Sequence, residues 1–199
     1  MYLKKNQIPI FIIFTAFLLF YAIHFYRTSN VEFLIYVGVV VFFFLLILLT
    51  NRRVKYPSPI LGGLAIWAFL HLSGGGIYLG ETRLYELMLV PLSQNYPIFR
   101  YDQLVHIIGF GVTTLVVFHI LKPLLKPNLK RWTALSIVVV MAGFGFGALN
   151  EVVEFMATIF ASRTGVGGYI NTSLDLVSNL IGAVLAMVYI RFREKRASC

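Results

Sequence analysis

The segment RYDQLVHIIGFGVTTLVVFHIL, residues 100–121, decides the fold of this chain. Its first turn is polar, and the remainder is an apolar run of the length that crosses a bilayer, about 20 residues. Other long apolar stretches of this kind follow one another along the chain. The sequence therefore predicts an all-α, polytopic membrane protein, a bundle of six transmembrane helices at residues 8–26, 31–50, 59–79, 101–121, 132–160 and 172–192.

The composition supports this architecture. Of the 199 residues, 59% are hydrophobic and only 13% are charged, whereas soluble domains carry about 25% charged residues. The mean hydropathy of +0.83 excludes an ordinary cytosolic domain and a disordered chain. Six spans of about 20 residues leave little sequence for anything else, so we expect one integral membrane domain over residues 1–199. The single cysteine, Cys199, excludes an intrachain disulfide.

The basic residues indicate how the helices are oriented. In the six-span arrangement, 13 of the 17 Lys and Arg residues fall on the side of the two termini and 4 on the other side. Cytoplasmic loops carry an excess of Lys and Arg, so we predict a plasma-membrane protein with both termini in the cytoplasm. The net charge of +9 then reflects topology, and no nucleic-acid partner is expected. The 4 residues on the outer side are Arg27, Arg83, Arg100 and Arg163.

The two halves of the chain differ in polarity. Residues 1–58 hold two almost purely apolar spans, which we interpret as lipid-facing support helices. Residues 59–199 hold four spans with polar side chains at helical spacing, which we interpret as the functional core. The segment 81–98 is too polar to cross a bilayer, so we expect it to be re-entrant or interfacial on the outer side.

Ionisable side chains within spans are costly and usually face the bundle interior. On the third span, His71 precedes the glycines at 74–76; the alternative is a hydrogen-bonded interfacial histidine at a helix end. On the fourth span, Asp102 and His106 are four residues apart and share one helix face. They suit a metal or a carboxylate–histidine pair, although a helix-start carboxylate beside an interfacial histidine would leave the same pattern.

The fifth and sixth spans carry similar pairs. Glu151 and Glu154 lie one turn apart and repel each other unless a cation or proton lies between them; the alternative is a helix that has already left the membrane. Asp175 and Asn179 are four residues apart, and the alternative for them is a capping acid above a seam of small residues.

All these groups fall at one membrane depth on the outer side, which favours a common site. Carboxylates with imidazole suit Zn²⁺, Mn²⁺ or Mg²⁺. Our first hypothesis is a metal-dependent hydrolase or transferase acting on a membrane lipid or lipid-linked substrate. The candidate metal ligands are His71, Asp102, His106, Glu151, Glu154 and Asp175, and all except His71 are also candidate catalytic residues. The candidate substrate-binding residues are Tyr78, Arg100, Tyr101, Asn150, Arg163 and Asn179.

Two alternatives remain open at this point. A proton-coupled transporter also places carboxylates and histidines inside a bundle, but its site usually lies near the bilayer midplane between repeats, and no internal repeat stands out here. A non-catalytic protein that binds lipid or a glycopeptide would need the arginines and aromatic residues more than the carboxylates. The sequence does not indicate the oligomeric state.

The polar motifs resemble those of a known family. YDQLVHIIGF (101–110) resembles the D-x3-H-x3-F opening of VanZ-like membrane proteins, and NEVVEF (150–155) with NTSLDLVSNLIGAVLA (171–186) resembles their acidic helix and D-x3-N-x2-G ending. HLSGGGIYL (71–79) and RYDQLVH (100–106) are more similar to the related, uncharacterised YjdF-like inner-membrane proteins. The resemblance implies a small plasma-membrane protein. It also indicates site residues at the positions that match the motifs, namely Asp102, His106, Glu151, Asp175 and Asn179.

VanZ-like proteins are associated with low-level resistance to the glycopeptide antibiotic teicoplanin. The acidic helix departs from their pattern, because Glu154 stands where the resemblance leads us to expect glutamine. A second carboxylate favours a metal and weakens the expectation of the resistance phenotype.

Overall fold

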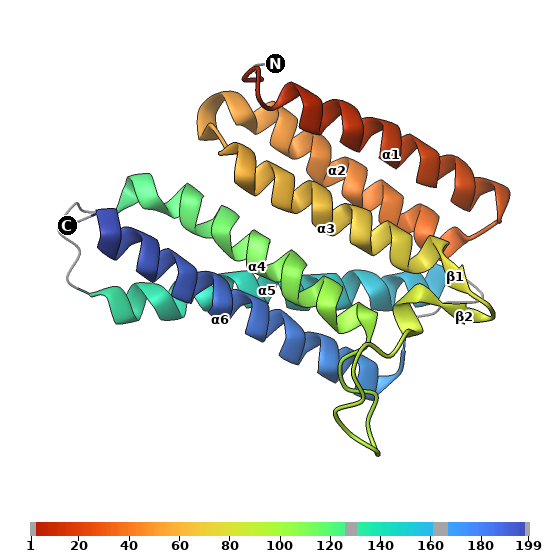
Figure 1. Ribbon diagram of the computed structural model, residues 1–199. Helices are drawn as coiled ribbons and strands as arrows, with labels where there is room; N and C mark the ends of the chain where they lie inside the picture. Colours follow the sequence, from red (N-terminus) through yellow and green to blue (C-terminus); the bar gives the residue numbers. More distant parts are fainter. Residues whose placement is uncertain (1–2, 126–130, 161–166, 198–199) are drawn as a thin grey trace.

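The computed structural model describes residues 3–125, 131–160 and 167–197. Within these ranges, six helices are long and apolar enough to cross a membrane, which confirms the predicted all-α bundle (Figure 1). They are α1 (Ile8–Arg27), α2 (Val31–Val54), α3 (Ser58–Gly76), α4 (Tyr101–Leu121), α5 (Trp132–Phe160) and α6 (Tyr169–Ala197).

The helix boundaries follow local sequence signals. Pro9 and Pro59 occupy the first turns of α1 and α3, where no backbone donor is needed. Helix α2 starts after Asn30, whose side chain accepts a hydrogen bond from the Phe33 amide at 3.1 Å, as expected of an N-cap. At the start of α4, the Arg100 amide donates to the Gln103 side chain at 2.5 Å. These caps satisfy amides that have no partner within the helix.

Several predicted boundaries were wrong, since α2 continues to Val54 and α6 to Ala197, beyond the expected ends at residues 50 and 192. The third span was expected to reach residue 79, but α3 ends at Gly76 because Ile77 is extended. The sixth was expected to begin at Thr172, but α6 begins at Tyr169. As a result, Asn171 lies inside the first turn of α6 rather than at its cap, and its side chain becomes available to the site.

The helices form two groups (Figure 1). Helices α1–α3 lie together, α4–α6 lie together, and α3 packs on α4 between the groups. The contact between α4 and α6 is the most extensive, because glycines let their backbones approach: a Cβ added to Gly111 would lie 3.3 Å from the carbonyl oxygen of Gly182. Such small-residue contacts are typical of membrane helices.

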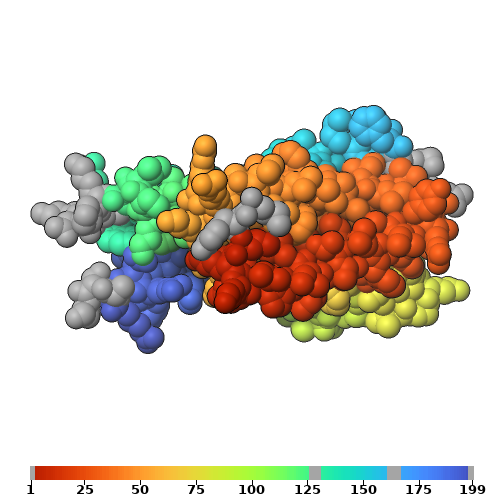
Figure 2. Space-filling model, turned by 90° about the horizontal axis from the view of Figure 1, so that it is seen from above, coloured from red at the N-terminus to blue at the C-terminus, as the bar shows by residue number. Residues whose placement is uncertain are grey.

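Apolar side chains fill the interior of the first group and also cover its outside. Phe25, Phe33 and Leu72 are almost completely buried between α1, α2 and α3, whereas Ile13 and Leu49 are 70% and 80% exposed. Figure 2 shows α1 and α2 side by side along much of one face. An apolar outer surface of this kind suits contact with lipid.

The start of α1 and the end of α6 lie at the same end of the bundle (Figure 1), as an even number of spans requires. The basic ends of α2 and α6 lie there too. Which side of the membrane this end faces stays a prediction. Of the charges on which that prediction depends, Lys126, Lys130 and Arg163 fall outside the described ranges.

A buried polar network holds this end together. Gln7 donates to the carbonyl of Tyr56 at 2.8 Å, and Asn51 donates to Gln7 at 3.0 Å and accepts from the Tyr56 amide at 3.1 Å. The network joins α1, the end of α2 and the turn into α3.

The segment between α3 and α4, residues 77–99, forms a cap over the opposite end. Strands β1 (Tyr78–Leu79) and β2 (Thr82–Arg83) make an antiparallel hairpin, and Gly80 at φ +64° allows its turn. The 3-10 helix η1 (Leu84–Glu86) follows, and an irregular loop then leads into α4. A second 3-10 helix, η2 (Lys122–Leu124), extends α4 at the end that holds the termini.

Candidate functional site

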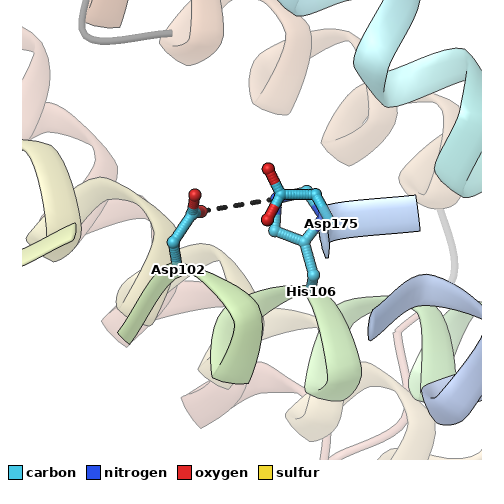
Figure 3. Close-up of side chains that lie close together, drawn as sticks. All are labelled: Asp102, His106 and Asp175. Atoms are coloured by element: carbon cyan, nitrogen blue, oxygen red, sulfur yellow. Dashed lines mark ion pairs between the residues drawn. The ribbon is translucent and has the colours of Figure 1, made fainter. Parts of the chain in front are cut away.

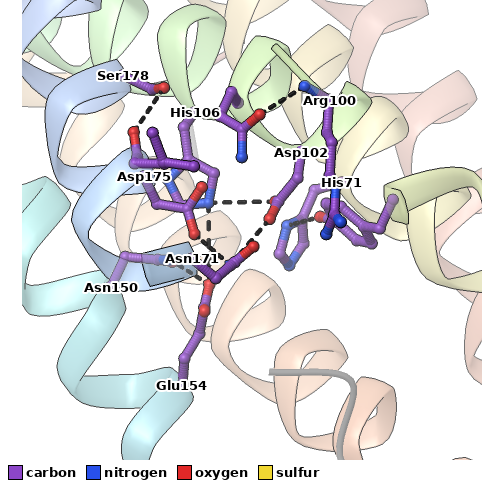
Figure 4. Close-up of polar contacts among 12 residues, drawn as sticks. His71, Arg100, Asp102, His106, Asn150, Glu154, Asn171, Asp175 and Ser178 are labelled. Atoms are coloured by element: carbon purple, nitrogen blue, oxygen red, sulfur yellow. Dashed lines mark hydrogen bonds and ion pairs between the residues drawn. The ribbon is translucent and has the colours of Figure 1, made fainter. Parts of the chain in front are cut away.

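The predicted acidic and histidine residues converge beneath the cap, at the end opposite the termini (Figure 4). Helix α4 supplies Asp102 and His106, α5 supplies Glu151 and Glu154, and α6 supplies Asp175. We call these five residues the acidic cluster. Because α4 and α6 begin here and α5 ends here, antiparallel packing brings three distant segments of the chain to one place.

His106 lies at the centre of the acidic cluster and is 5% exposed. Its Nε2 atom is 3.4 Å from Asp102 Oδ1 and 4.0 Å from Glu154 Oε1, and its Nδ1 atom is 3.6 Å from Glu151 Oε1. Nδ1 also lies 2.9 Å from Asn179 Oδ1. Figure 3 shows the ion pair between Asp102 and His106, with the Asp175 side chain beside the ring.

Three asparagines orient the acidic cluster. Asn171 donates to Asp175 Oδ2 at 2.5 Å and to Asp102 Oδ2 at 3.3 Å, so one amide joins α6 to α4. Asn150 donates to Glu154 at 2.8 Å. Asn179, on the His106 ring, fits against α5 only because residue 147 is glycine: a Cβ there would lie 2.6 Å from its Nδ2 atom.

Several carboxylate oxygens of the acidic cluster have no hydrogen-bond partner among the described residues. Among the residues that the structure describes, both carboxylate oxygens of Glu151 and the Oδ1 atom of Asp175 make no hydrogen bond of normal geometry. Asp175 is 0% exposed, so bulk water does not reach its carboxylate either. Buried carboxylates need a partner, and a bound cation is one kind of partner that these oxygens could take.

Two overlapping sets of side chains could hold a metal ion. One set is Asp102, His106 and Asp175, and the other is His106, Glu151 and Glu154; in each set one ligand atom per residue lies within 4.8 Å of the others. Two ligands that each lie about 2.1 Å from an ion are at most about 4.2 Å apart. Small side-chain movements would therefore close either set around Zn²⁺, Mn²⁺ or Mg²⁺.

A cavity of about 190 Å³ opens beside the acidic cluster. Asp102, Glu154 and Asn171 line it. The rest of the lining comes from α2, α3, the cap and the residue before α4, and includes Glu32, Tyr36, His71, Arg83, Tyr85 and Arg100. A small polar ligand in this cavity would touch residues from both helix groups.

A family comparison agrees with the membrane architecture. The model of a family described as predicted membrane protein (DUF2238) matches residues 7–196. The chain belongs to this family. The match covers all six helices and the whole acidic cluster. No curated protein and no solved structure matches the chain.

The remaining predicted residues of this DUF2238 chain lie in different places. His71 lines the cavity but is in neither candidate metal-binding set; its Nδ1 atom is 2.5 Å from the Tyr85 hydroxyl. Arg100 lines the cavity as well. The Tyr101 hydroxyl is turned toward α3, where it donates to the carbonyl of Leu70 at 3.1 Å. Tyr78 is 52% exposed in the cap hairpin, and Arg163 lies outside the described ranges.

Sequence reasoning missed several residues of the site, including Arg83 and Glu86 of the cap. Asn171 had a usable signal, because it precedes Asp175 by one helical turn and so shares its face. Tyr36 and Glu32 lie on a helix that we had assigned to lipid contact. Tyr85 lies in the polar segment before α4, where no periodicity indicates which side chain turns inward.

Proposed function

We propose that this protein is a metal-dependent hydrolase or transferase that acts on a lipid or lipid-linked substrate in the outer leaflet of the plasma membrane. The observation that carries the proposal is the acidic cluster, which holds carboxylate oxygens without a hydrogen bond among the described residues and is buried in a bundle of apolar helices beside a polar cavity.

Charge balance supports the metal. Asp102, Glu151, Glu154 and Asp175 surround a single histidine. Two unit charges 4.8 Å apart repel by about 3.5 kcal/mol at an effective dielectric constant of about 20. A divalent ion would turn this repulsion into attraction, whereas isolated charges in a membrane helix would remain costly.

The donor set also suits catalysis. A metal in the acidic cluster would polarise a phosphoryl or acyl oxygen and make a bound water a stronger nucleophile. The chain's own contribution is to hold the ligands: Asn171 fixes two carboxylates at once, Asn150 fixes Glu154, and Asn179 fixes the His106 ring. Partners of this kind orient the ligands of metal sites and tune their basicity.

The position of the cavity supports a lipid substrate. It lies where the apolar helices end and the polar cap begins, so a headgroup could enter while its hydrocarbon chain stays in the bilayer. Helices α2 and α5, which both contribute to the cavity, touch at few points. A lipid could approach between them.

Transport is less well supported by the packing below the site. On the side of the acidic cluster away from the cap, Gly111 and Gly182 bring α4 and α6 into close contact. Thr114 and Val139 are 0% exposed in the next layer. This packing favours a closed pocket over a pathway, and we infer that the pocket faces outward and that the termini are cytoplasmic. We also retain the narrower likeness to VanZ-like and YjdF-like proteins as an inference from the motifs.

An activity assay tests the proposal. The protein in lipid nanodiscs is incubated with phosphatidic acid, lipid pyrophosphates and lipid-linked sugars, with Mg²⁺, Mn²⁺ or Zn²⁺ or with a chelator. We expect release of the headgroup or phosphate that needs the metal and falls at least about 100-fold in Asp175→Asn. Glu81→Gln, an exposed acid in the cap, is the matched control and should retain activity. Equal release by the wild type and Asp175→Asn would contradict the proposal.

A further inference from the structure

The cavity beside the acidic cluster has a second wall of different chemistry. Tyr36 from α2, His71 from α3, Arg83 from the cap and Arg100 from the start of α4 all line it. Each of these side chains carries O–H or N–H groups that donate hydrogen bonds. We call these four residues the donor wall; the carboxylates of Asp102 and Glu154 line the same cavity.

The hydrogen bond between Tyr85 and His71 determines what His71 offers. Burial raises the pKa of the Tyr85 hydroxyl well above its ordinary value, so the hydroxyl keeps its proton at neutral pH. The hydroxyl can therefore donate to His71 Nδ1, 2.5 Å away, in the tautomer of His71 that leaves Nδ1 without hydrogen. A neutral imidazole that accepts at Nδ1 carries its hydrogen on Nε2. His71 is then a donor in the cavity wall, which agrees with its absence from both metal-binding sets.

Two donor-wall residues have donors with no partner among the described residues: the Tyr36 hydroxyl and Arg100 Nε. Tyr36 is only 5% exposed, so its hydroxyl is a buried polar group that lacks a hydrogen bond. Such a group costs about 1–3 kcal/mol. An acceptor-rich ligand in the cavity would remove this cost.

Arg83 is held at the edge of the same cavity. Its guanidinium lies 3.6 Å from Glu32 and 5.8 Å from the centre of the Phe33 ring. The ion pair and the ring fix a long, flexible side chain that would otherwise lose entropy on binding a ligand. The donor wall is thus partly organised in advance.

We propose that the cavity binds the phosphate group of a phosphate ester, with its oxygens between the metal of the acidic cluster and the donor wall. The inference rests on the proposed function, because it needs the metal. A phosphate directs its oxygens in several directions and can reach both walls. A carboxylate has two oxygens in one plane and can reach only one of them.

Charge makes the binding of phosphate and metal interdependent. The cavity lining carries Glu32, Glu86, Asp102 and Glu154 against two arginines. An anion would be repelled from this lining without a cation, and a metal bound there alone keeps open positions. Each ligand should therefore raise the affinity of the other by the same factor.

The test measures Mn²⁺ binding by electron paramagnetic resonance, with the protein in phosphatidylcholine nanodiscs. Mn²⁺ is titrated alone, with inorganic phosphate, and with acetate at equal ionic strength. A parallel series replaces part of the phosphatidylcholine with phosphatidic acid, which separates a lipid phosphate from the free anion. We expect at least one phosphate source to tighten Mn²⁺ binding roughly tenfold, within the usual range of coupling, and acetate to have little effect.

Variants separate the donor wall from the metal ligands. Tyr36→Phe and Tyr85→Phe each keep the ring and remove one hydroxyl, so they should fold and bind Mn²⁺ alone as the wild type does. Both should lose most of the tightening by phosphate, Tyr85→Phe because His71 is no longer held as a donor. Tyr26→Phe, at a tyrosine that is 76% exposed, is the matched control and should retain it.

The outcomes distinguish this inference from the proposed function. If Mn²⁺ does not bind, both the proposed function and the phosphate assignment are wrong. If Mn²⁺ binds but neither phosphate source tightens it, or acetate tightens it equally, the phosphate assignment is wrong and the metal site stands. Unchanged coupling in both tyrosine variants would show that the donor wall does not bind the anion.

Discussion

Replacing Glu151 by glutamine should stabilise the protein much more in the absence of metal than in its presence. In the metal-free protein, oxygens of Glu151 and Glu154 lie within 4.8 Å of each other, a separation at which two charges repel by about 3.5 kcal/mol at an effective dielectric constant of about 20. Glutamine has nearly the same shape and no charge. Glu151→Gln should therefore stabilise the metal-free protein by about 3.5 kcal/mol, and by less where a proton or the His106 ring, 3.6 Å from Glu151, already offsets the repulsion.

Metal should remove most of this advantage. At a metal concentration about 100 times the dissociation constant, binding stabilises the wild type by about 2.7 kcal/mol, whereas Glu151→Gln has lost a ligand and gains little. The difference between the two proteins should then shrink from about 3.5 to about 0.8 kcal/mol. A change of 1 kcal/mol moves Tm by about 2–4 °C in a chain of this size, so the effect is measurable.

The assay is thermal unfolding in detergent micelles, followed by tryptophan fluorescence with chelator and with Mn²⁺. Trp67 reports on the site because it stacks on His71 at 5.5 Å. Glu81→Gln, the exposed acid in the cap, controls for loss of a charge and should match the wild type under both conditions. A Glu151→Gln protein that is no more stable than the wild type in chelator, or that gains equally from Mn²⁺, would refute the reasoning.

Three further predictions test the support of the site. Gly147→Ala should destabilise the protein and weaken metal binding, because the added Cβ would collide with the Asn179 amide that holds the His106 ring. Gly145→Ala has open space around its Cβ and should be neutral or stabilising by up to about 1 kcal/mol. Unfolding experiments and Mn²⁺ titrations on both variants compare them. Asn51→Ala should lower the free energy of unfolding by about 2 kcal/mol, because it breaks the buried network at Gln7 and Tyr56. Asn95→Ala, at an exposed asparagine, should leave it unchanged in the same unfolding assay. Burial raises the pKa of the Tyr85 hydroxyl, so this group stays protonated from about pH 7 to pH 9. The difference in unfolding free energy between Tyr85→Phe and the wild type should therefore be constant over this pH range and diminish only at higher pH.

The fold was largely predictable because a bilayer permits few solutions. A chain that must satisfy its backbone inside lipid forms helices of fixed length, so hydropathy alone located six of them. The acidic cluster was predictable for a related reason: Asp102, His106, Glu151, Glu154 and Asp175 break apolar runs at the same depth, and antiparallel helices then bring them together.

The cap and the second wall of the cavity were not predictable. Tyr85 reaches His71 through an irregular segment, and its partner is 14 residues away along the chain. Tyr36 resembles any aromatic residue near the end of an apolar helix, and only packing of α2 beside α3 directs it to the cavity. Contacts between elements, rather than patterns within them, determine both positions.

Elemental analysis of the purified protein tests the central claim most directly. The protein is prepared without chelator beside a Glu154→Gln, Asp175→Asn double variant, and circular dichroism confirms that both retain their helices. The account predicts about one or two equivalents of a divalent metal in the wild type and loss of that metal in the folded variant. A wild type without metal that takes up none on reconstitution, or equal metal in both proteins, would contradict it.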